Sequence, residues 1–197
     1  MSVSGRRVRI VFVVLAFVGL PACDSDAARD TRRVGAPTAP DPTTLDRPAP
    51  DPTAPRPPLD AFEARIIRVV DGDTVIATPA GGSRLRVRII GMDSPETASS
   101  PRGEQCHGRA ATAYAVSVLS GVRVRAAYEG SAHRDRYQRE LWHVWLPDGT
   151  FFAGRAVELG HARALRVKPH VAHAAYIDAK QQQARAAARG LWGACSQ

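Results

Sequence analysis

Short segments in the middle of the chain alternate hydrophobic and polar residues, which is the period of strands with one buried face. Five segments follow this pattern, at residues 62–70, 74–77, 83–90, 123–128 and 141–146. Three more have apolar residues at helical spacing, at 104–119, 151–159 and 171–189, and a glycine follows each closely. The pattern predicts an α+β domain of five short strands with three interposed helices.

That element order matches a five-stranded Greek-key β-barrel of the OB type, an architecture that often binds oligonucleotides. A chain of 197 residues has room for one such domain with appendages. We assign the domain to residues 60–197 and expect it to be a monomer.

The first 23 residues have the features of a targeting segment. Arginines at positions 6, 7 and 9 precede an apolar run, Ile10 to Leu20, that is too short for a comfortable transmembrane helix. Leu20-Pro21-Ala22-Cys23 resembles a bacterial lipobox, so we interpret 1–23 as a lipoprotein signal peptide with Cys23 as the lipidated residue. We therefore expect an exported protein, lipid-anchored to the membrane of the bacterial cell envelope. The alternative is an ordinary secretory signal and a secreted protein.

Residues 24–59 contain nine prolines, with Thr, Ala and Asp between them. Fixed φ angles and missing amide donors exclude regular helix or sheet, so we predict a disordered, extended linker.

The chain is strongly basic, with 27 Lys and Arg against 19 Asp and Glu. Leaving out residues 1–59, with eight basic and six acidic residues, the domain keeps a net charge of +6. This charge indicates a polyanionic partner, either nucleic acid or an acidic membrane surface. The alternative is a basic surface that serves only solubility.

The candidate chemistry gathers in residues 71–96. Asp73 follows a tight Gly72 turn, and Asp93 and Glu96 lie in a Pro-containing loop after the return strand. An antiparallel return brings these carboxylates to the same edge of a sheet, where hard oxygen ligands suit Ca²⁺ or Mg²⁺. Arg88 lies beside them on a strand where Arg84, Arg86 and Arg88 share one face. Opposite charges around one cleft indicate an anionic substrate.

Three motifs in order resemble the staphylococcal nuclease (thermonuclease) family over roughly residues 62–192. They are Asp71-Gly72-Asp73-Thr74 with Asp93-Ser94-Pro95-Glu96-Thr97, then Asp135-Arg136-Tyr137-Gln138-Arg139, and then Gly160-His161-Ala162-Arg163. The resemblance implies a Ca²⁺-dependent endonuclease that hydrolyses DNA or RNA to 3′-phosphorylated products.

The same resemblance implies a role for each site residue. Asp73, Asp93 and the backbone carbonyl of Ser94 would bind Ca²⁺. Glu96 would orient or deprotonate the attacking water, and Arg88 and Arg139 would stabilise the transition state. Arg136 and Tyr137 would bind the neighbouring phosphate.

Two departures from the family pattern stand out. Gln138 replaces a glycine before Arg139, and residues 164–169 replace a segment in which two tyrosines stack on the nucleotide base. The competing hypothesis is therefore a catalytically weak nucleic-acid-binding OB module tethered to the envelope. The five catalytic and metal-binding side chains are all present, which favours the enzyme. A surface adhesin is a third reading that rests only on the N-terminal tail.

Cys106 and Cys195 are the two thiols that remain once Cys23 is acylated. An even pair in an exported domain predicts a disulfide, and the alternative is two free thiols.

Overall fold

The computed structural model describes residues 51–195. The predicted signal peptide with Cys23, and residues 24–50 of the predicted linker, lie outside the described residues. Within 51–195, no helix has the length and apolar character needed to cross a membrane.

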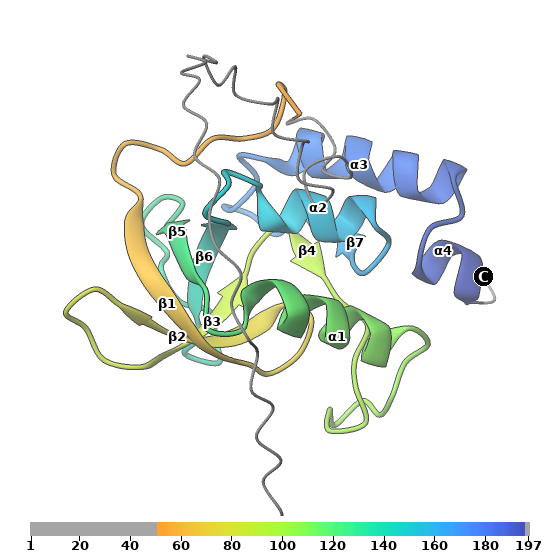
Figure 1. Ribbon diagram of the computed structural model, residues 1–197, viewed down its shortest axis with the longest axis horizontal. Helices are drawn as coiled ribbons and strands as arrows, with labels where there is room; N and C mark the ends of the chain where they lie inside the picture. The colour runs from red at the N-terminus through yellow and green to blue at the C-terminus, as the bar shows by residue number, and fades with distance from the viewer. Residues whose placement is uncertain (1–50, 196–197) are drawn as a thin grey trace, which may run out of the picture. The chain divides into compact units, whose positions relative to one another are not determined.

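Five strands close into a barrel in the order β1-β2-β3-β6-β5, as the sequence pattern predicts (Figure 1). They are β1 Phe62–Val69, β2 Thr74–Pro79, β3 Leu85–Ile89, β5 Arg123–Ala127 and β6 Glu140–Trp145. Neighbouring barrel strands are antiparallel except β3 and β6, which close the barrel in parallel. The closed barrel has no free sheet edge, and the fold is of the predicted OB type.

A two-stranded ribbon outside the barrel was not predicted. It pairs β4, Met92–Asp93, with β7, Arg163–Ala164. Two-residue strands carry no alternating pattern to detect. The ribbon joins the chain around Asp93 to the segment that follows helix α2, which spans Phe152–Glu158.

The described residues contain four helices, where the sequence predicted three. They are α1 Gly108–Leu119, α2, α3 Ala174–Ala186 and α4 Leu191–Ala194. Gly190, with φ 53°, separates α3 from α4. Helix α1 begins later than predicted because the Gln105 amide donates to the Glu96 carbonyl at 2.9 Å and His107 is left-handed, with φ 71°.

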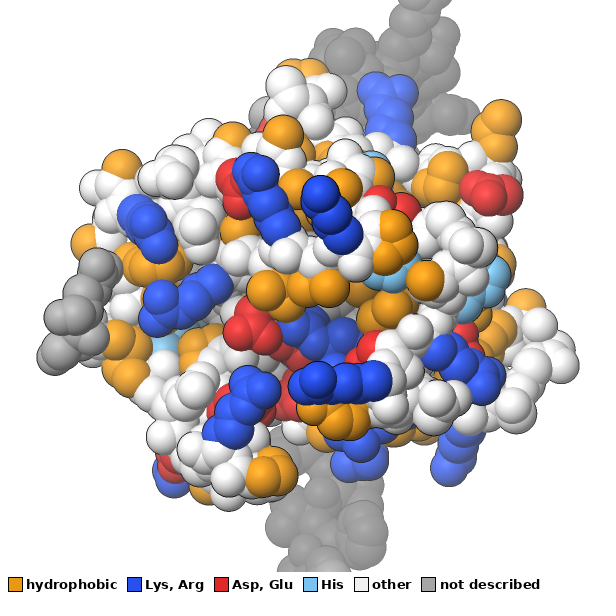
Figure 2. Space-filling model, turned by 180° about the vertical axis from the view of Figure 1, so that it is seen from behind, with side chains coloured by type: hydrophobic (Ala, Val, Ile, Leu, Met, Phe, Trp, Pro, Cys, Tyr) orange, Lys and Arg blue, Asp and Glu red, His pale blue; other side chains and the backbone are white. Residues whose placement is uncertain are grey.

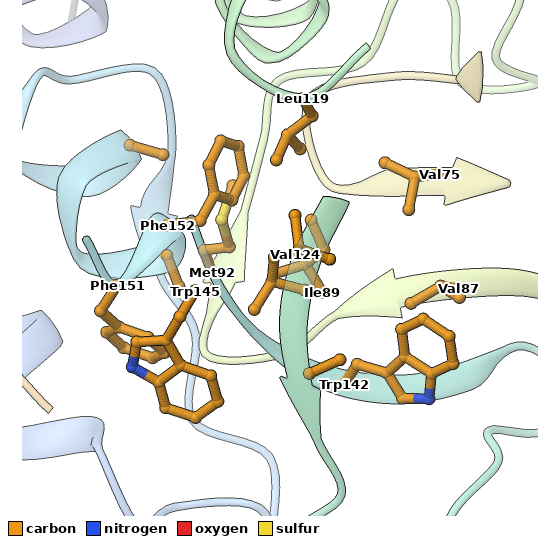
Figure 3. Close-up of a cluster of buried hydrophobic side chains, with 14 of the residues drawn as sticks. Val75, Val87, Ile89, Met92, Leu119, Val124, Trp142, Trp145, Phe151 and Phe152 are labelled. Atoms are coloured by element: carbon orange, nitrogen blue, oxygen red, sulfur yellow. The ribbon is translucent and has the colours of Figure 1, made fainter. Parts of the chain in front are cut away.

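Inward side chains of the barrel meet the apolar faces of the helices in one core (Figure 3). Val75, Val87 and Ile89 come from β2 and β3, Leu119 comes from α1, and Phe152 comes from α2. Helices α2 and α3 pack against each other above the barrel (Figure 1). Burial of these side chains, at about 25 cal/mol per Å² of apolar surface, is the main stabilising contribution.

The end of the predicted linker contacts the domain. Asp51 forms an ion pair with Lys180 of α3 at 2.8 Å and accepts a hydrogen bond from the Tyr176 hydroxyl at 3.2 Å. The indole Nε1 of Trp145 donates to the Pro55 carbonyl at 2.7 Å. Asp51 and Pro55 are thus bonded to α3 and β6, so this part of the predicted linker does not form a free spacer.

Cys106 and Cys195 form a disulfide with an S–S distance of 2.04 Å. It ties the loop before α1 to the residue that follows α4. The loop that carries Glu96 and the end of the chain are therefore covalently joined.

Candidate active site

Asp73, Arg88 and Asp93 meet where β2 begins and where β3 leads into β4. One guanidinium nitrogen, Nη2 of Arg88, lies 3.3 Å from Asp73 Oδ2 and 3.0 Å from Asp93 Oδ1. Thr74, at the start of β2, pairs with Arg88 of β3. After β3 the chain turns directly into β4, which carries Asp93. Asp73 and Arg88 are buried, whereas the Asp93 side chain is half exposed. The cluster is rigid on one side and open to a ligand on the other.

The turn before Asp73 adds a further carboxylate. Asp71 Oδ1 accepts hydrogen bonds from the amides of Asp73 at 3.0 Å and Thr74 at 2.7 Å. Burial and the neighbouring charge of Asp73 raise the pKa of Asp71 to about 6. Burial also raises the pKa of Asp93, against the opposing effect of Arg88. The three carboxylates Asp71, Asp73 and Asp93 carry more negative charge than the single guanidinium of Arg88 neutralises.

Gly72 allows the two ends of the hairpin to approach this closely. A Cβ atom on Gly72 would lie 2.6 Å from the Cβ of Ser94, a distance that real side chains do not adopt. The Ser94 amide donates to Asp73 Oδ2 at 2.8 Å, so the loop after β4 is bonded directly to the turn before β2. The glycine is required for the approach that brings Asp73 and Asp93 together.

The arrangement fits a hard divalent cation. Asp73 and Asp93 both contact Nη2 of Arg88, so their carboxylates lie close to each other. Carboxylate oxygens are the ligands that Ca²⁺ prefers. Within residues 51–195, no group of three or more His, Cys, Asp or Glu side chains is placed to hold a metal ion. A cation here therefore needs further oxygen atoms, which the Ser94 backbone carbonyl and a substrate phosphate can supply.

Arg139 is joined to the carboxylates through Thr74, a residue that sequence reasoning did not select. Nη1 of Arg139 lies 3.4 Å from Thr74 Oγ1, and that hydroxyl donates to Asp73 Oδ1 at 3.0 Å. Nε of Arg139 also donates to Asp135 Oδ2 at 2.7 Å. Thr74 belongs to the Asp-Gly-Asp-Thr motif, so its position beside Asp73 was the available signal.

Glu96 lies in the loop beyond Asp93, and its backbone is held while its side chain stays accessible. Its amide donates to Gln105 Oε1 at 3.0 Å, and a Cβ on Gly108 would lie 2.1 Å from its carbonyl oxygen. The carboxylate is 28% exposed and pairs with Arg102 at 3.5 Å. Its negative charge is among the causes that raise the pKa of Asp93, after burial and Asp73. Sequence reasoning missed Gln105 and Gly108, which fix this loop only through tertiary contacts.

A cleft of about 510 Å³ is lined by Arg88, whose guanidinium contacts Asp73 and Asp93. Arg88, Arg136, Tyr137 and Arg139 line one part of it. The Tyr137 ring, 62% exposed, lies under Arg136 at 4.8 Å and Arg139 at 5.5 Å, and the Arg136 guanidinium donates to its hydroxyl at 2.7 Å. On the face shown in Figure 2, acidic side chains lie among a larger number of Lys and Arg side chains. The cleft thus presents cations to a ligand beside the carboxylates.

Another part of the cleft wall belongs to the segment that differs from the family pattern. Leu165 and Val167 line it with exposed apolar surface and no aromatic ring. Glu129, another residue that sequence reasoning missed, holds this wall by accepting hydrogen bonds from the amides of Val171 and Ala172, both at 2.8 Å. Helix α3 starts at Ala174, later than predicted, because the backbone of His173 before it is not helical, with φ −106° and ψ 12°.

Gln138 occupies the position where the family pattern has glycine, and its φ of 61° is left-handed. Its amide still closes the turn on the Asp135 carbonyl at 3.0 Å. The loop that carries Arg139 therefore forms with glutamine, at the cost of backbone strain.

We expect Gln138→Gly to raise the free energy of unfolding by up to about 1 kcal/mol. Left-handed backbone costs a non-glycine residue about 1–2 kcal/mol, and glycine removes this cost. The greater freedom of glycine in the unfolded chain offsets roughly 0.5–1 kcal/mol of the stabilisation. Urea denaturation measures the change, with Gln138→Ala as the control that keeps the strain and should show no gain. A less stable glycine variant would contradict the assignment of strain to this position.

Comparison with known proteins gives the same family that the motifs resemble. The family model described as staphylococcal nuclease homologue matches residues 86–194. The chain is 34% identical over 128 residues to a thermonuclease of Staphylococcus hyicus, covering 65% of this chain and 74% of that protein. It is 37% identical over 125 residues to a thermonuclease of Staphylococcus intermedius, covering 64% and 73%. A protein of Escherichia coli O157:H7 described as an uncharacterized endonuclease is 32% identical over 131 residues, covering 66% and 77%. The barrel, the carboxylate pair with its arginines and these matches together show that the chain belongs to the staphylococcal nuclease family.

Proposed function

We propose that this protein is a Ca²⁺-dependent endonuclease that hydrolyses the phosphodiester bonds of DNA or RNA and leaves 3′-phosphorylated products. One observation carries the proposal. The Arg88 guanidinium lies against two carboxylates suited to a cation and lines the same cleft as Arg139. Relatives named thermonuclease and endonuclease support a nucleic-acid substrate.

Asp73, Asp93 and the Ser94 carbonyl are the residues that would hold the cation. Bound there, Ca²⁺ supplies Lewis-acid stabilisation of a phosphate oxygen and neutralises the crowded carboxylates.

The side chains of this chain supply the rest. Glu96, whose side chain is accessible, orients a water molecule and accepts its proton. Arg88 and Arg139 donate hydrogen bonds to the phosphate oxygens, where negative charge increases in the transition state. Hydrolysis of this kind depends on positioning and electrostatics, and it needs no covalent enzyme intermediate.

Cleavage of single-stranded DNA and of RNA, with Ca²⁺ and with excess chelator, tests the proposal. We expect activity with Ca²⁺, loss of activity in chelator and recovery when Ca²⁺ is restored. End-group analysis of the products should find 3′-phosphates. Full activity in excess chelator would refute the metal dependence, and binding without cleavage under every metal tested would favour the alternative of a catalytically weak binding module.

We further propose that the domain is exported and anchored through a lipidated Cys23. The basic n-region, the short apolar run and the Leu-Pro-Ala-Cys sequence support this placement. Metabolic labelling with a fatty-acid analogue tests it, with Cys23→Ser as the control, which should be unlabelled.

We expect short substrates to bind weakly. Stacking of a base on an aromatic ring contributes about 1–3 kcal/mol, and Leu165 and Val167 offer no ring. The KM for a dinucleotide should therefore be high, while the KM for long single-stranded DNA should rise steeply with salt. Leu165→Tyr with Val167→Tyr should lower KM for the dinucleotide about 10-fold or more and change kcat little, because stacking stabilises ground and transition states alike. A low, salt-insensitive KM for the dinucleotide in the unmodified protein would show that Tyr137 already provides the stacking.

A further inference from the structure

The outer face of the barrel carries a group of arginines that the catalytic site does not use. They are Arg65 and Arg68 of β1, Arg84 and Arg86 at β3, and Arg123 of β5. All five are exposed, and within residues 51–195 none of their side chains has an ion pair or a hydrogen bond. Arginines elsewhere in the domain are mostly partnered, for example Arg134 with Glu140 and Arg155 with Glu158. We call these five residues the arginine track.

Strand register places the arginine track in rows that start at the catalytic arginine. Thr74 and Arg88 form the first row, and Ile76 pairs with both Arg68 and Arg86 in the second. The third row contains Arg65 between Thr78 and Arg123. Successive rows are two residues apart, or about 7 Å, and their side chains share the outer face. Arg88 itself is buried against Asp73 and Asp93, so the exposed positive charge begins in the second row, about 7 Å from Arg88, and continues along the barrel.

The far end of the track is a groove of about 470 Å³. Arg65, Arg84 and Arg123 line it, with exposed Ile67 beside them and Glu63 as the acidic side chain in its lining. Glu63 lies opposite Arg125 in the register, whereas Arg65 lies opposite Arg123. Like charges directly opposite each other destabilise a sheet. The Arg65–Arg123 pair therefore destabilises the barrel, and the fold gives no reason for its presence.

We propose that the arginine track binds the phosphate backbone of the single-stranded segment of a polynucleotide that extends out of the cleft. This inference rests on the proposed function for the identity of the polyanion. A positively charged groove without aromatic side chains binds backbone and not bases, so the contact is independent of sequence. Charge complementarity and continuity with Arg88 favour a polynucleotide over an anionic membrane surface. Long substrates gain affinity from the track, whereas short substrates, which do not reach it, lack base stacking at Leu165.

The test compares two triple variants with equal loss of charge. The track variant is Arg65→Gln, Arg86→Gln and Arg123→Gln; the control variant is Arg56→Gln, Arg109→Gln and Arg189→Gln, which changes exposed arginines elsewhere. Binding of labelled single-stranded DNA of increasing length is measured in chelator over a salt series. We expect the track variant to bind long strands about 10-fold to 100-fold more weakly and to lose about 2 from the slope of log K against log salt. The control variant should change far less.

A variant with lysine at the same three positions keeps the charge and should retain most of the binding, which excludes misfolding as the cause. Cleavage of a dinucleotide in the presence of Ca²⁺ should be unchanged in the track variant. If no variant cleaves anything and the track variant still loses long-strand binding, the arginine track stands and the proposed hydrolysis fails. Equal binding by the track and control variants overturns the inference. Retained DNA binding with lost binding to phosphatidylglycerol vesicles also overturns it, in favour of a membrane surface.

Discussion

Replacing Arg139 with alanine is expected to reduce kcat by about 1,000-fold while the domain stays folded. Removing one donor to a developing oxyanion costs about 10²–10³ in kcat, and an arginine that stabilises a phosphoryl transition state contributes up to about 10⁵. Arg139 also reaches Asp73 through Thr74, so its loss weakens the support of the carboxylate that we propose to bind the metal. Steady-state kinetics on single-stranded DNA with saturating Ca²⁺ gives kcat, and a urea melt gives the stability.

Arg155→Ala is the matched control. Arg155 pairs with Glu158 three residues away at 2.9 Å on α2, much as Arg139 pairs with Asp135 at 2.7 Å, but it does not line the cleft. Its loss should leave kcat unchanged and cost less than about 1 kcal/mol of stability. A kcat for Arg139→Ala within a few-fold of the unmodified protein would remove Arg139 from the catalytic residues.

Loss of the disulfide is expected to have the largest effect on stability. Cys106 and Cys195 are 89 positions apart, so their bond restricts the unfolded chain over much of the domain. On the chain-entropy model, a loop of this length stabilises the fold by roughly 4 kcal/mol. Cys106→Ser with Cys195→Ser should lower the free energy of unfolding by about that amount in urea denaturation without reductant.

The unmodified domain in reductant provides the comparison, since its stability should approach that of the double variant. Mass spectrometry after alkylation shows whether the thiols are bonded in the native protein. Two alkylated cysteines under native, non-reducing conditions would exclude the bond. A double variant as stable as the unmodified domain would show that the closed loop contributes nothing.

The amino-acid sequence by itself determined the barrel and identified the residues of the candidate site. Alternation of apolar and polar residues is a local property, so each barrel strand could be located to within a few residues of its observed bounds. Four of the side chains to which we assign metal binding or catalysis, Asp73, Arg88, Asp93 and Glu96, lie within one hairpin and the loop after it. A short stretch of chain therefore specifies their spacing. The face shared by Arg86 and Arg88 also follows from the period of a strand alone.

Only the tertiary structure decided which distant residues support that site. Thr74 links Asp73 to Arg139 across 65 positions, and Glu129 holds the amide of Val171 across 42. The docking of Asp51 on Lys180 and the opposition of Arg65 and Arg123 likewise appear only when separate elements meet. No local pattern encodes these contacts, because each depends on the register and packing of elements far apart in the chain, and those are set by burial of the whole core.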